Sequence, residues 1–313
     1  MAHDHRFRFG VQVGGSRGAA DWAALAHKVE DLGYSTLVMP DHFVDTELAP
    51  MVGIAFAAAV TTSLRVGMLV LDNDYKHPAV TAKEAATVDV LSDGRLELGI
   101  GAGWMRADYE ALGLPYDTAG VRIERLAEAL TIIKRAWGDG PFDHDGGHYT
   151  IRSYDGVPKP IQRPRPPIVV GGGGPKLLRL AGREADIVGI NPNLRAGTIT
   201  GDAVQTSLAE QTRQKVAWVR EGAGERFADL ELQVRYFLAA ITDDAQGLAG
   251  ALAPSFGTTV DEALASGVAL VGTVDEVCDT LVQRREEWGA SYVVLGDDTF
   301  EAFAPVVSRL AGT

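Results

Sequence analysis

The chain of 313 residues holds a single cysteine, Cys278, which excludes an internal disulfide. Such usage is typical of a reducing cytosol, where we expect the protein to work. No uninterrupted apolar run reaches the roughly 18–20 residues of a membrane-spanning helix. Cations are scarce too, because 29 lysines and arginines face 42 acidic residues, a net charge of −13. Without a basic run, neither nucleic acid nor an anionic membrane is an expected partner.

The chain instead repeats a short apolar run followed by a helical pattern. In the first half these runs start at Phe7, Thr36, Arg65 and Arg95. In the second half they cover 167–171, 186–191, 230–242 and 291–296. The clearest helical patterns cover 22–32, 50–62, 78–91, 118–137, 203–221 and 274–288. Strand–helix units repeated in this way predict parallel strands joined by right-handed crossovers.

Eight such units predict an α/β fold, a (β/α)₈ TIM barrel formed by residues 1–313 as one domain. The strands read as continuous apolar runs, as buried parallel strands require. Two irregular segments, 138–167 and 243–273, are predicted insertions at the C-terminal face, overhanging the barrel mouth.

A doubly wound sheet with an appended domain is the structural alternative. It would require the Gly-x-Gly-x-x-Gly dinucleotide fingerprint after the first strand. The first turn, residues 14–18, reads GGSRG, and the later glycine run at 99–103 has Trp104 where the third glycine belongs. The fingerprint fails at both places, which favours the barrel.

In a barrel, the residues just beyond each strand are the candidates for function. Asp41 and His42 follow the second strand. Histidine exchanges a proton near neutral pH, and an adjacent carboxylate can tune it. A helix cap beside a hydrogen-bonded loop histidine is the alternative, but the position at a strand end favours the functional interpretation. Gln12, Asp72 and Asn191 lie at comparable strand ends.

Two glycine-rich turns follow later strands. Residues 171–174 are four glycines followed by Pro175, which suits the first position of a helix. Backbone amides at such a helix start bind anions, so we favour a phosphate cradle over a flexible turn. The stretch Gly101-Ala102-Gly103 could let a flat ring lie against the backbone. Glycines that thin a barrel corner, with Trp104 as packing, would explain it equally well.

For two other features we favour a purely structural explanation over a role in binding. His144 and His148 have a spacing that would suit a metal on a helix, but two glycines between them make a helix, and hence a metal site, a poor interpretation. The proline-rich segment 158–167 carries three cations. It is interpreted as a solvated strap leading into the fifth strand rather than as a lid edge.

Three stretches resemble one known family. They are PDHF at 40–43, the segment LVLDNDYKHPAVTAKEAATVDVLSDGRLELGIGAGW at 69–104, and IVVGGGGPKLLRLAGREADIVGIN at 168–191. They are similar to the luciferase-like monooxygenase superfamily, and more narrowly to its actinobacterial branch that uses the deazaflavin coenzyme F-420. The resemblance extends from Phe7 to Leu310.

The resemblance implies a flavin or deazaflavin at the barrel mouth, its phosphate on Gly172, Gly173 and Gly174. It also implies a non-proline cis peptide at Leu69–Val70, behind the cofactor ring. With the strand-end candidates, the predicted cofactor contacts are Gln12, Asp41, His42, Leu69, Val70, Asp72, Gly101, Ala102, Gly103, Gly172, Gly173, Gly174 and Asn191. His42 and Asp41 are the predicted catalytic residues, and no metal is expected.

The implied activity is hydride transfer between coenzyme F-420 and a small organic substrate, with His42 as proton donor or acceptor. Asp45 and Trp104 stand where sugar-phosphate dehydrogenases of the family carry Trp and Glu, which argues against a sugar phosphate. One alternative is an FMN-dependent monooxygenase that uses oxygen and a separate reductase. Another is a cofactor-free binding barrel.

The resemblance also implies a homodimer, and the charge of the rim would help to distinguish the two cofactors. A basic rim at Lys159, Arg163 and Arg165 would favour the polyglutamate tail of coenzyme F-420, and an acidic rim would favour FMN.

Overall fold

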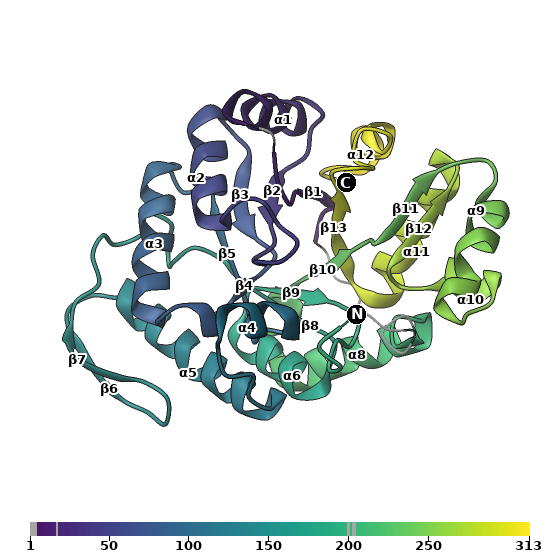
Figure 1. The fold of residues 1–313 in the computed structure, drawn as a ribbon. Coiled ribbons are helices and arrows are strands. Elements are labelled where there is room, and N and C mark those ends of the chain that lie inside the picture. Colours follow the sequence, from purple (N-terminus) through teal and green to yellow (C-terminus); the bar gives the residue numbers. More distant parts are fainter. Residues whose placement is uncertain (1–4, 17, 199–200, 202–204) are drawn as a thin grey trace.

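The computed structural model describes residues 5–16, 18–198, 201 and 205–313. Eight parallel strands close into a ring, and helices surround it (Figure 1). In order around the ring, the strands are β1 (Arg8–Gln12), β2 (Thr36–Met39), β3 (Arg65–Met68), β5 (Leu96–Gly101), β8 (Ile168–Gly172), β9 (Ile187–Ile190), β10 (Glu231–Arg235) and β13 (Ala290–Gly296). Pairing of β1 with β13 and of β3 with β5 completes the ring, which confirms the predicted TIM barrel.

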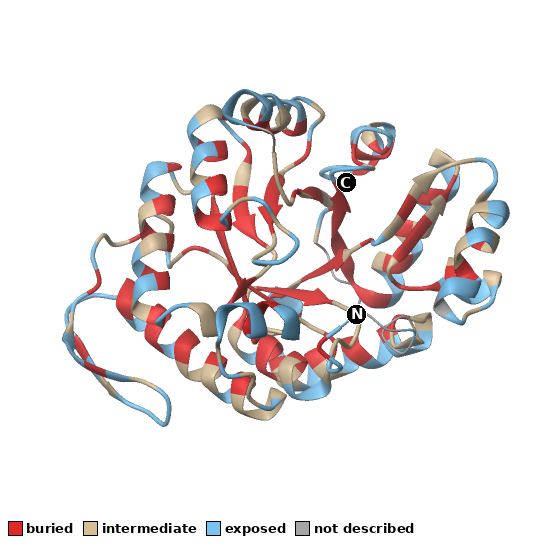
Figure 2. Ribbon diagram, viewed as in Figure 1, coloured by how far each residue is buried: buried red, intermediate tan, exposed pale blue. Residues whose placement is uncertain are grey.

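The surrounding helices follow the predicted alternation. They are α1 (Ala19–Asp31), α2 (Pro50–Val60), α3 (Pro78–Leu91), α5 (Ala119–Trp137), α6 (Pro175–Glu184), α8 (Ala209–Ala223), α11 (Val274–Trp288) and α12 (Ala304–Leu310). Proline starts α2, α3 and α6, where a missing amide hydrogen costs nothing. The helix predicted over 203–221 begins at Ala209 among the described residues, and 203–204 lie outside them. In Figure 2 the strands are buried and the outward helix faces are exposed.

The N-terminal end of the barrel is filled by an ion-pair cluster. The carboxylate of Glu97, 3% exposed, lies 2.7 Å from Arg8 Nη1 and 2.7 Å from Arg65 Nε. Burial opposes ionisation, but the two guanidinium groups hold the pKa of Glu97 below its usual range. Arg8 also pairs with Glu231 across the barrel. Because charged side chains fill this end, a ligand has to enter at the other, C-terminal end.

The single strand predicted over 230–242 is wrong, because two strands cover that range. β10 ends at Arg235, and β11 (Leu238–Ile241) leaves the barrel to pair in parallel with β12 (Ala269–Gly272). Of the two residues between them, Tyr236 is buried and Phe237 is 57% exposed. The change of direction there gives β11 a separate hydrogen-bonding partner.

The second insertion is more regular than its sequence suggests. Between β11 and β12 it forms α9 (Ala245–Leu252), the turn η3 (Ala253–Phe256) and α10 (Val260–Ala265). These helices enclose a small apolar cluster of Ala249, Ala253 and Ala263. The unit stands beside the barrel in Figure 1.

The first insertion lies mainly outside the barrel and does not overhang the mouth. Strands β6 (Phe142–Asp145) and β7 (Thr150–Tyr154) form an antiparallel hairpin that projects from the barrel in Figure 1. Glu128 of α5 ties down its turn through His144 Nε2, at 2.9 Å, and the amides of His148 and Tyr149. The hairpin reaches the mouth side through Tyr149, whose Oη accepts a hydrogen bond from Asn73 Nδ2 at 3.2 Å.

For the same reason, the proline-rich segment does not form a basic rim at the mouth. The segment 158–167 returns along the N-terminal end of the strands, where the amides of Ile161 and Gln162 bind Asp89. Arg165 pairs with Asp186, the residue before β9, and Lys159 pairs with Asp155. Helix α5 has carried the chain away from the mouth, so the chain must reach the start of β8 at the opposite end. Lys159, Arg163 and Arg165 therefore do not line the mouth.

Among the described residues, no helix has both the length and the apolar character that crossing a membrane requires.

Candidate functional site

His42, beyond the end of β2, is held by a carboxylate that the sequence did not reveal. Its Nδ1 lies 2.7 Å from Oδ2 of Asp108, in α4 (Arg106–Leu112) beyond β5. The other carboxylate oxygen accepts the amides of Phe43 and Val44, at 2.8 and 3.0 Å. Burial opposes ionisation, yet these hydrogen bonds lower the pKa of Asp108. An ionised Asp108 accepts a hydrogen bond from Nδ1–H, so it fixes both the orientation and the tautomer of the imidazole.

The other ring nitrogen of His42 is left available. Among the residues described, Nε2 has no protein partner, and the side chain is 17% exposed. The edge of the ring packs against Trp104, with centroids 5.4 Å apart at 85°. His42 therefore presents one nitrogen that can exchange a proton with a bound molecule.

A second acidic group lies next to His42. Oδ2 of Asp41 accepts the amide of Asp72 at 3.1 Å, which links the β2 loop to β4 (Leu71–Asp72). Oδ1 of Asp72 accepts Tyr109 Oη at 3.1 Å and the amide of Asp74 at 2.9 Å. Burial raises the pKa of Asp72 to about 7, and the charges of Asp74 and Asp41 add to that rise. Burial also raises the pKa of Asp41. Acids with perturbed pKa values in a strand-end cluster are typical of functional sites.

The peptide bond between Leu69 and Val70 is cis, as the resemblance implied. Gln12 Nε2 donates to the carbonyl oxygen of Leu69 at 2.9 Å. Gln12 Oε1 in turn accepts Nε of Arg235, at the end of β10, at 2.9 Å. The structure thus joins the predicted residues Gln12 and Leu69 and adds Arg235, which sequence reasoning missed.

The glycines near the end of β5 let that strand approach the segment around the cis peptide. A Cβ on Gly99 would lie inside contact distance of the carbonyl oxygen of Met68, and one on Gly101 would lie 2.8 Å from Val70 Cγ2. Gly103 has φ +70°, and a Cβ there would overlap Tyr109 Oη. Close packing is therefore one reason for these glycines. Their contact with a flat ring stays a prediction.

The predicted cradle joins β8 to α6. Among the described residues, no protein acceptor binds the amides of Gly173 and Gly174, and no side chain caps α6. Asn191 lies beside the cradle, because a Cβ on Gly171 would be 2.9 Å from its Nδ2. Lys215 of α8, only 3% exposed, fixes the neighbouring backbone by donating to the carbonyl oxygen of Asn191 at 2.7 Å. Free amides at an uncapped helix start are suited to an anion such as a phosphate.

The structure identifies the glycine that best tests this cradle. A Cβ on Gly173 would collide with the backbone of Pro192, so Gly173→Val would disturb the fold itself. A Cβ on Gly174 meets only Asn193 Nδ2, at 4.0 Å. We expect Gly174→Val to weaken binding of a phosphorylated cofactor about tenfold or more, because the branched side chain would occupy the anion's space.

Equilibrium titration measures that effect, and the melting temperature checks the fold. Gly147→Val is the matched control, since a Cβ there has open space in the outer hairpin. A Gly174→Val variant with wild-type affinity and wild-type melting would remove the cradle from the site.

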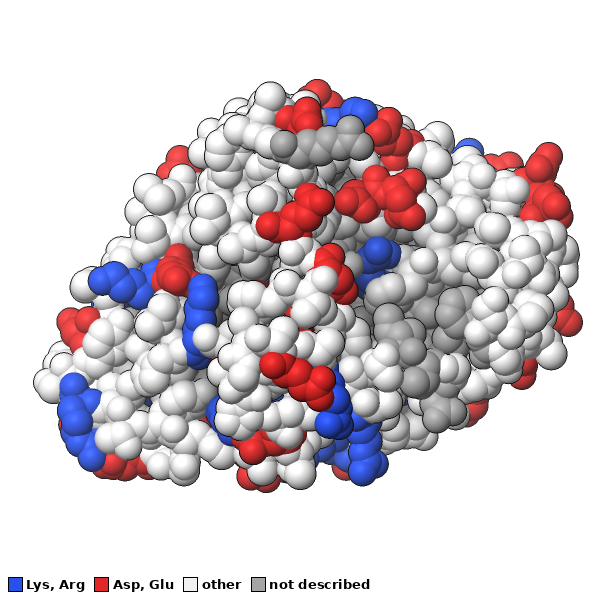
Figure 3. Space-filling view, viewed as in Figure 1, with Lys and Arg blue, Asp and Glu red and all other residues white. Residues whose placement is uncertain are grey.

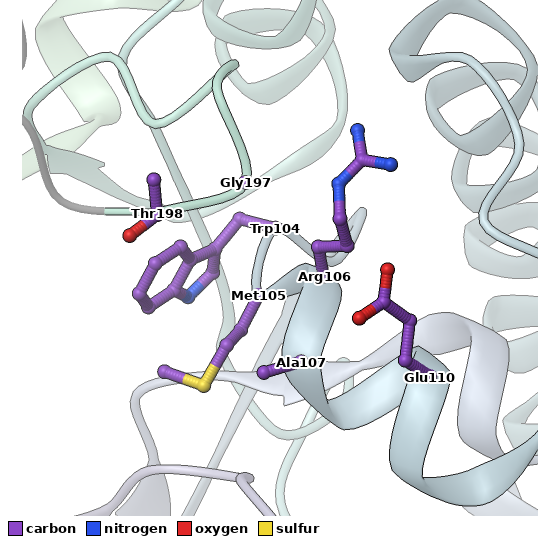
Figure 4. Close-up of a pocket in the computed structure, with 7 residues that line it drawn as sticks. All are labelled: Trp104, Met105, Arg106, Ala107, Glu110, Gly197 and Thr198. Carbon is purple, nitrogen blue, oxygen red and sulfur yellow. The ribbon is translucent and has the colours of Figure 1, made fainter.

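An open hollow of about 410 Å³ lies beside His42, between α4 and the loop after β9. Figure 4 shows the Trp104 ring facing this hollow, with Thr198 across from it and Met105 below. Because the Trp104 ring also contacts His42, the hollow adjoins the proposed proton-exchange position.

Comparison with known proteins places this geometry among redox enzymes. Residues 5–292 match the model of the luciferase-like monooxygenase family. The chain is 32% identical over 190 residues to an F-420-dependent glucose-6-phosphate dehydrogenase of Microbacterium testaceum, covering 57% of this chain and 55% of that one. It is also 32% identical over 135 residues to an FMNH₂-dependent dimethylsulfone monooxygenase of Pseudomonas putida, covering 43% and 37%. The matched regions thus span about half or less of these relatives.

A solved structure supports the fold. The coenzyme F-420-dependent tetrahydromethanopterin reductase of Methanopyrus kandleri superposes with a TM-score of 0.75 at 20% identity, covering 98% of this chain and 99% of that one.

Proposed function

Because the chain belongs to the luciferase-like monooxygenase family, we propose that it is an oxidoreductase that transfers a hydride between coenzyme F-420 and a small organic substrate. The observation that carries the proposal is His42, whose Nδ1 is bound by Asp108 and whose Nε2 is open. Relatives that use F-420 and relatives that use FMN both match the chain, so the choice of coenzyme is the part that needs testing.

The residues at the mouth fit a phosphorylated cofactor with a flat ring. Gly172, Gly173 and Gly174 would line the phosphate site, where the amides of Gly173 and Gly174 have no other acceptor among the residues described. The ring would lie near Leu69, Val70 and the backbone of residues 101–103 at the C-terminal end of β5. When bound, the deazaflavin supplies two-electron hydride chemistry.

The protein's own contribution is to manage a proton. A substrate that gains a hydride at a carbonyl or an activated double bond develops negative charge, and His42 Nε2 is the group proposed to neutralise it. Asp108 stabilises the positively charged imidazole before the proton leaves. Asp41 and Asp72 are proposed to assist His42 in this proton transfer. In the reverse direction, His42 would remove the proton as a base.

Anaerobic equilibrium titration with coenzyme F-420 and with FMN tests the choice of coenzyme. We expect tighter binding of F-420 and no oxygen consumption when reduced cofactor and protein are mixed in air. Tighter binding of FMN together with oxygen uptake would instead establish the monooxygenase, which needs a separate reductase. Failure of both cofactors to bind at about tens of micromolar would favour a cofactor-free barrel. The homodimer stays a prediction, which light scattering can test.

A further inference from the structure

A second hollow at the mouth gathers positive charge in an otherwise acidic protein. It has a volume of about 440 Å³ and lies between the start of α4, the start of α5 and the loop after β9. Its lining residues include Arg106, Arg122 and Arg195. The chain as a whole carries a net charge of −13. In Figure 3, basic atoms lie together near α6 on the face shown, beside acidic atoms near α4.

The three guanidinium groups are not neutralised by the protein. Within the described part of the chain, none of them has a carboxylate oxygen within 4.0 Å. Asp117, the carboxylate that lines the hollow, is paired with Arg125 instead. Arg122 is 4% exposed and donates to backbone oxygens such as that of Ala102, at 3.0 Å. Dipoles satisfy its hydrogen bonds, but they leave its charge uncompensated.

Two of the three guanidinium groups are also held in place by stacking. Arg106 and Arg122 lie over the ring of Tyr116, at 4.6 and 4.3 Å from its centroid. Arg106 and Arg195 are exposed toward solvent. Like charges held together repel one another unless an anion joins them. Preordered guanidinium groups bind carboxylates with two parallel hydrogen bonds, which makes a carboxylate-rich ligand the best match.

The hollow adjoins the proposed phosphate cradle. Lys176, the second residue of α6, donates to the carbonyl oxygen of Gly120 at 3.3 Å, and Gly120 lines the hollow. Gly174 of the cradle lies at the start of the same helix. A ligand whose phosphate rests on the cradle could therefore extend into the hollow.

We propose that this hollow binds the carboxylate groups of a small polyanionic ligand through Arg106, Arg195 and the buried charge of Arg122. The proposal rests on the proposed function where the ligand is the polyglutamate tail of coenzyme F-420. An anionic substrate is the other source of the same chemistry.

The test compares coenzyme F-420 with its glutamate tail to the same coenzyme without glutamates. For the wild-type protein in about 50 mM salt we expect the tailed form to bind about tenfold more tightly, with the advantage shrinking at high salt. In Arg106→Gln/Arg195→Gln the advantage should disappear, while the affinity for the tail-free form stays the same. Lys28→Gln/Arg213→Gln removes the same charge at exposed positions on α1 and α8 and serves as the control.

A second arm adds a triglutamate peptide, alone, to the wild-type protein and the double variant. Arginine-dependent peptide binding without a tail advantage would support the hollow and identify a free polycarboxylate as its ligand. A tail advantage that persists in the double variant, or the absence of both effects, would overturn the proposal. Failure of both coenzyme forms to bind contradicts the proposed function, and the peptide arm still decides the hollow.

Discussion

Replacing His42 with alanine is expected to lower turnover about 10²- to 10³-fold, while the affinity for the cofactor changes little. The reason is the geometry of the imidazole, whose Nδ1 is bound by Asp108 at 2.7 Å and whose Nε2 faces no protein group among the described residues. Steady-state turnover and cofactor titration, measured on the same preparation, separate the two effects. His148→Ala, at an exposed hairpin position, is the control.

Substitution of Asp108 tests the same proton transfer while leaving His42 in place. In Asp108→Asn the amide oxygen can still accept the amides of Phe43 and Val44, so the loop should keep its shape. The amide cannot stabilise a positive imidazole, and we expect kcat to fall with KM little changed. Asp108→Glu should restore part of kcat. Wild-type turnover in His42→Ala would remove His42 from the mechanism, and an unchanged kcat in Asp108→Asn would reduce Asp108 to a structural cap.

Much of the fold followed from the sequence because buried parallel strands leave a strong signal. Each barrel strand is buried on both faces, so it appears as a continuous apolar run, and prolines and capping residues mark the helices. The run at 230–242 misled us because Tyr236 and Phe237 join β10 to β11 without a glycine, a proline or another turn residue. An apolar pattern records burial and does not record which sheet buries it.

The strand ends were predictable, but their partners were not. His42 and Asp41 stand at a strand end in the sequence, whereas Asp108 is 66 residues from His42 and lies on a separate helix. Neither α4 nor Arg235 carries a local motif that announces such a contact. The cations of 158–167 are a second example of what the sequence does not reveal. Composition does not say at which end of a barrel a connecting segment runs, and Arg165 lies at the N-terminal end.

The stability of the protein should depend on pH through Asp72. Its pKa of about 7 in the folded state exceeds the ordinary value of 3.8, because the carboxyl group is buried beside Asp41 and Asp74. Between about pH 4 and pH 7 the folded protein therefore keeps a proton that the unfolded chain has released. Stability is greatest below that range, falls as pH rises through it, and carries the full cost of the ionised group above pH 7. The shift corresponds to a cost of about 4 kcal/mol.

Asp72→Asn removes that ionisation while its amide oxygen can still accept Tyr109 Oη and the amide of Asp74. We expect the variant to be more stable than the wild-type protein by about 2–4 kcal/mol at pH 8, with the difference largely gone at pH 4. Urea unfolding at the two pH values measures it. Asp139→Asn, at an exposed loop position, should show no such difference. An equal effect of Asp72→Asn at both pH values would mean that ionisation of Asp72 is not the cause.

A carboxyl group that weakens the fold at neutral pH, beside the histidine proposed to move a proton, is a cost that function can explain. Acids in strained electrostatic positions are concentrated at functional sites, where stability is lost in exchange for activity. We therefore expect Asp72→Asn to gain stability at pH 8 and to lose turnover there. A variant that is both more stable and fully active would show that Asp72 has no part in the reaction and would leave His42, Asp108 and Asp41 as the proton-handling group.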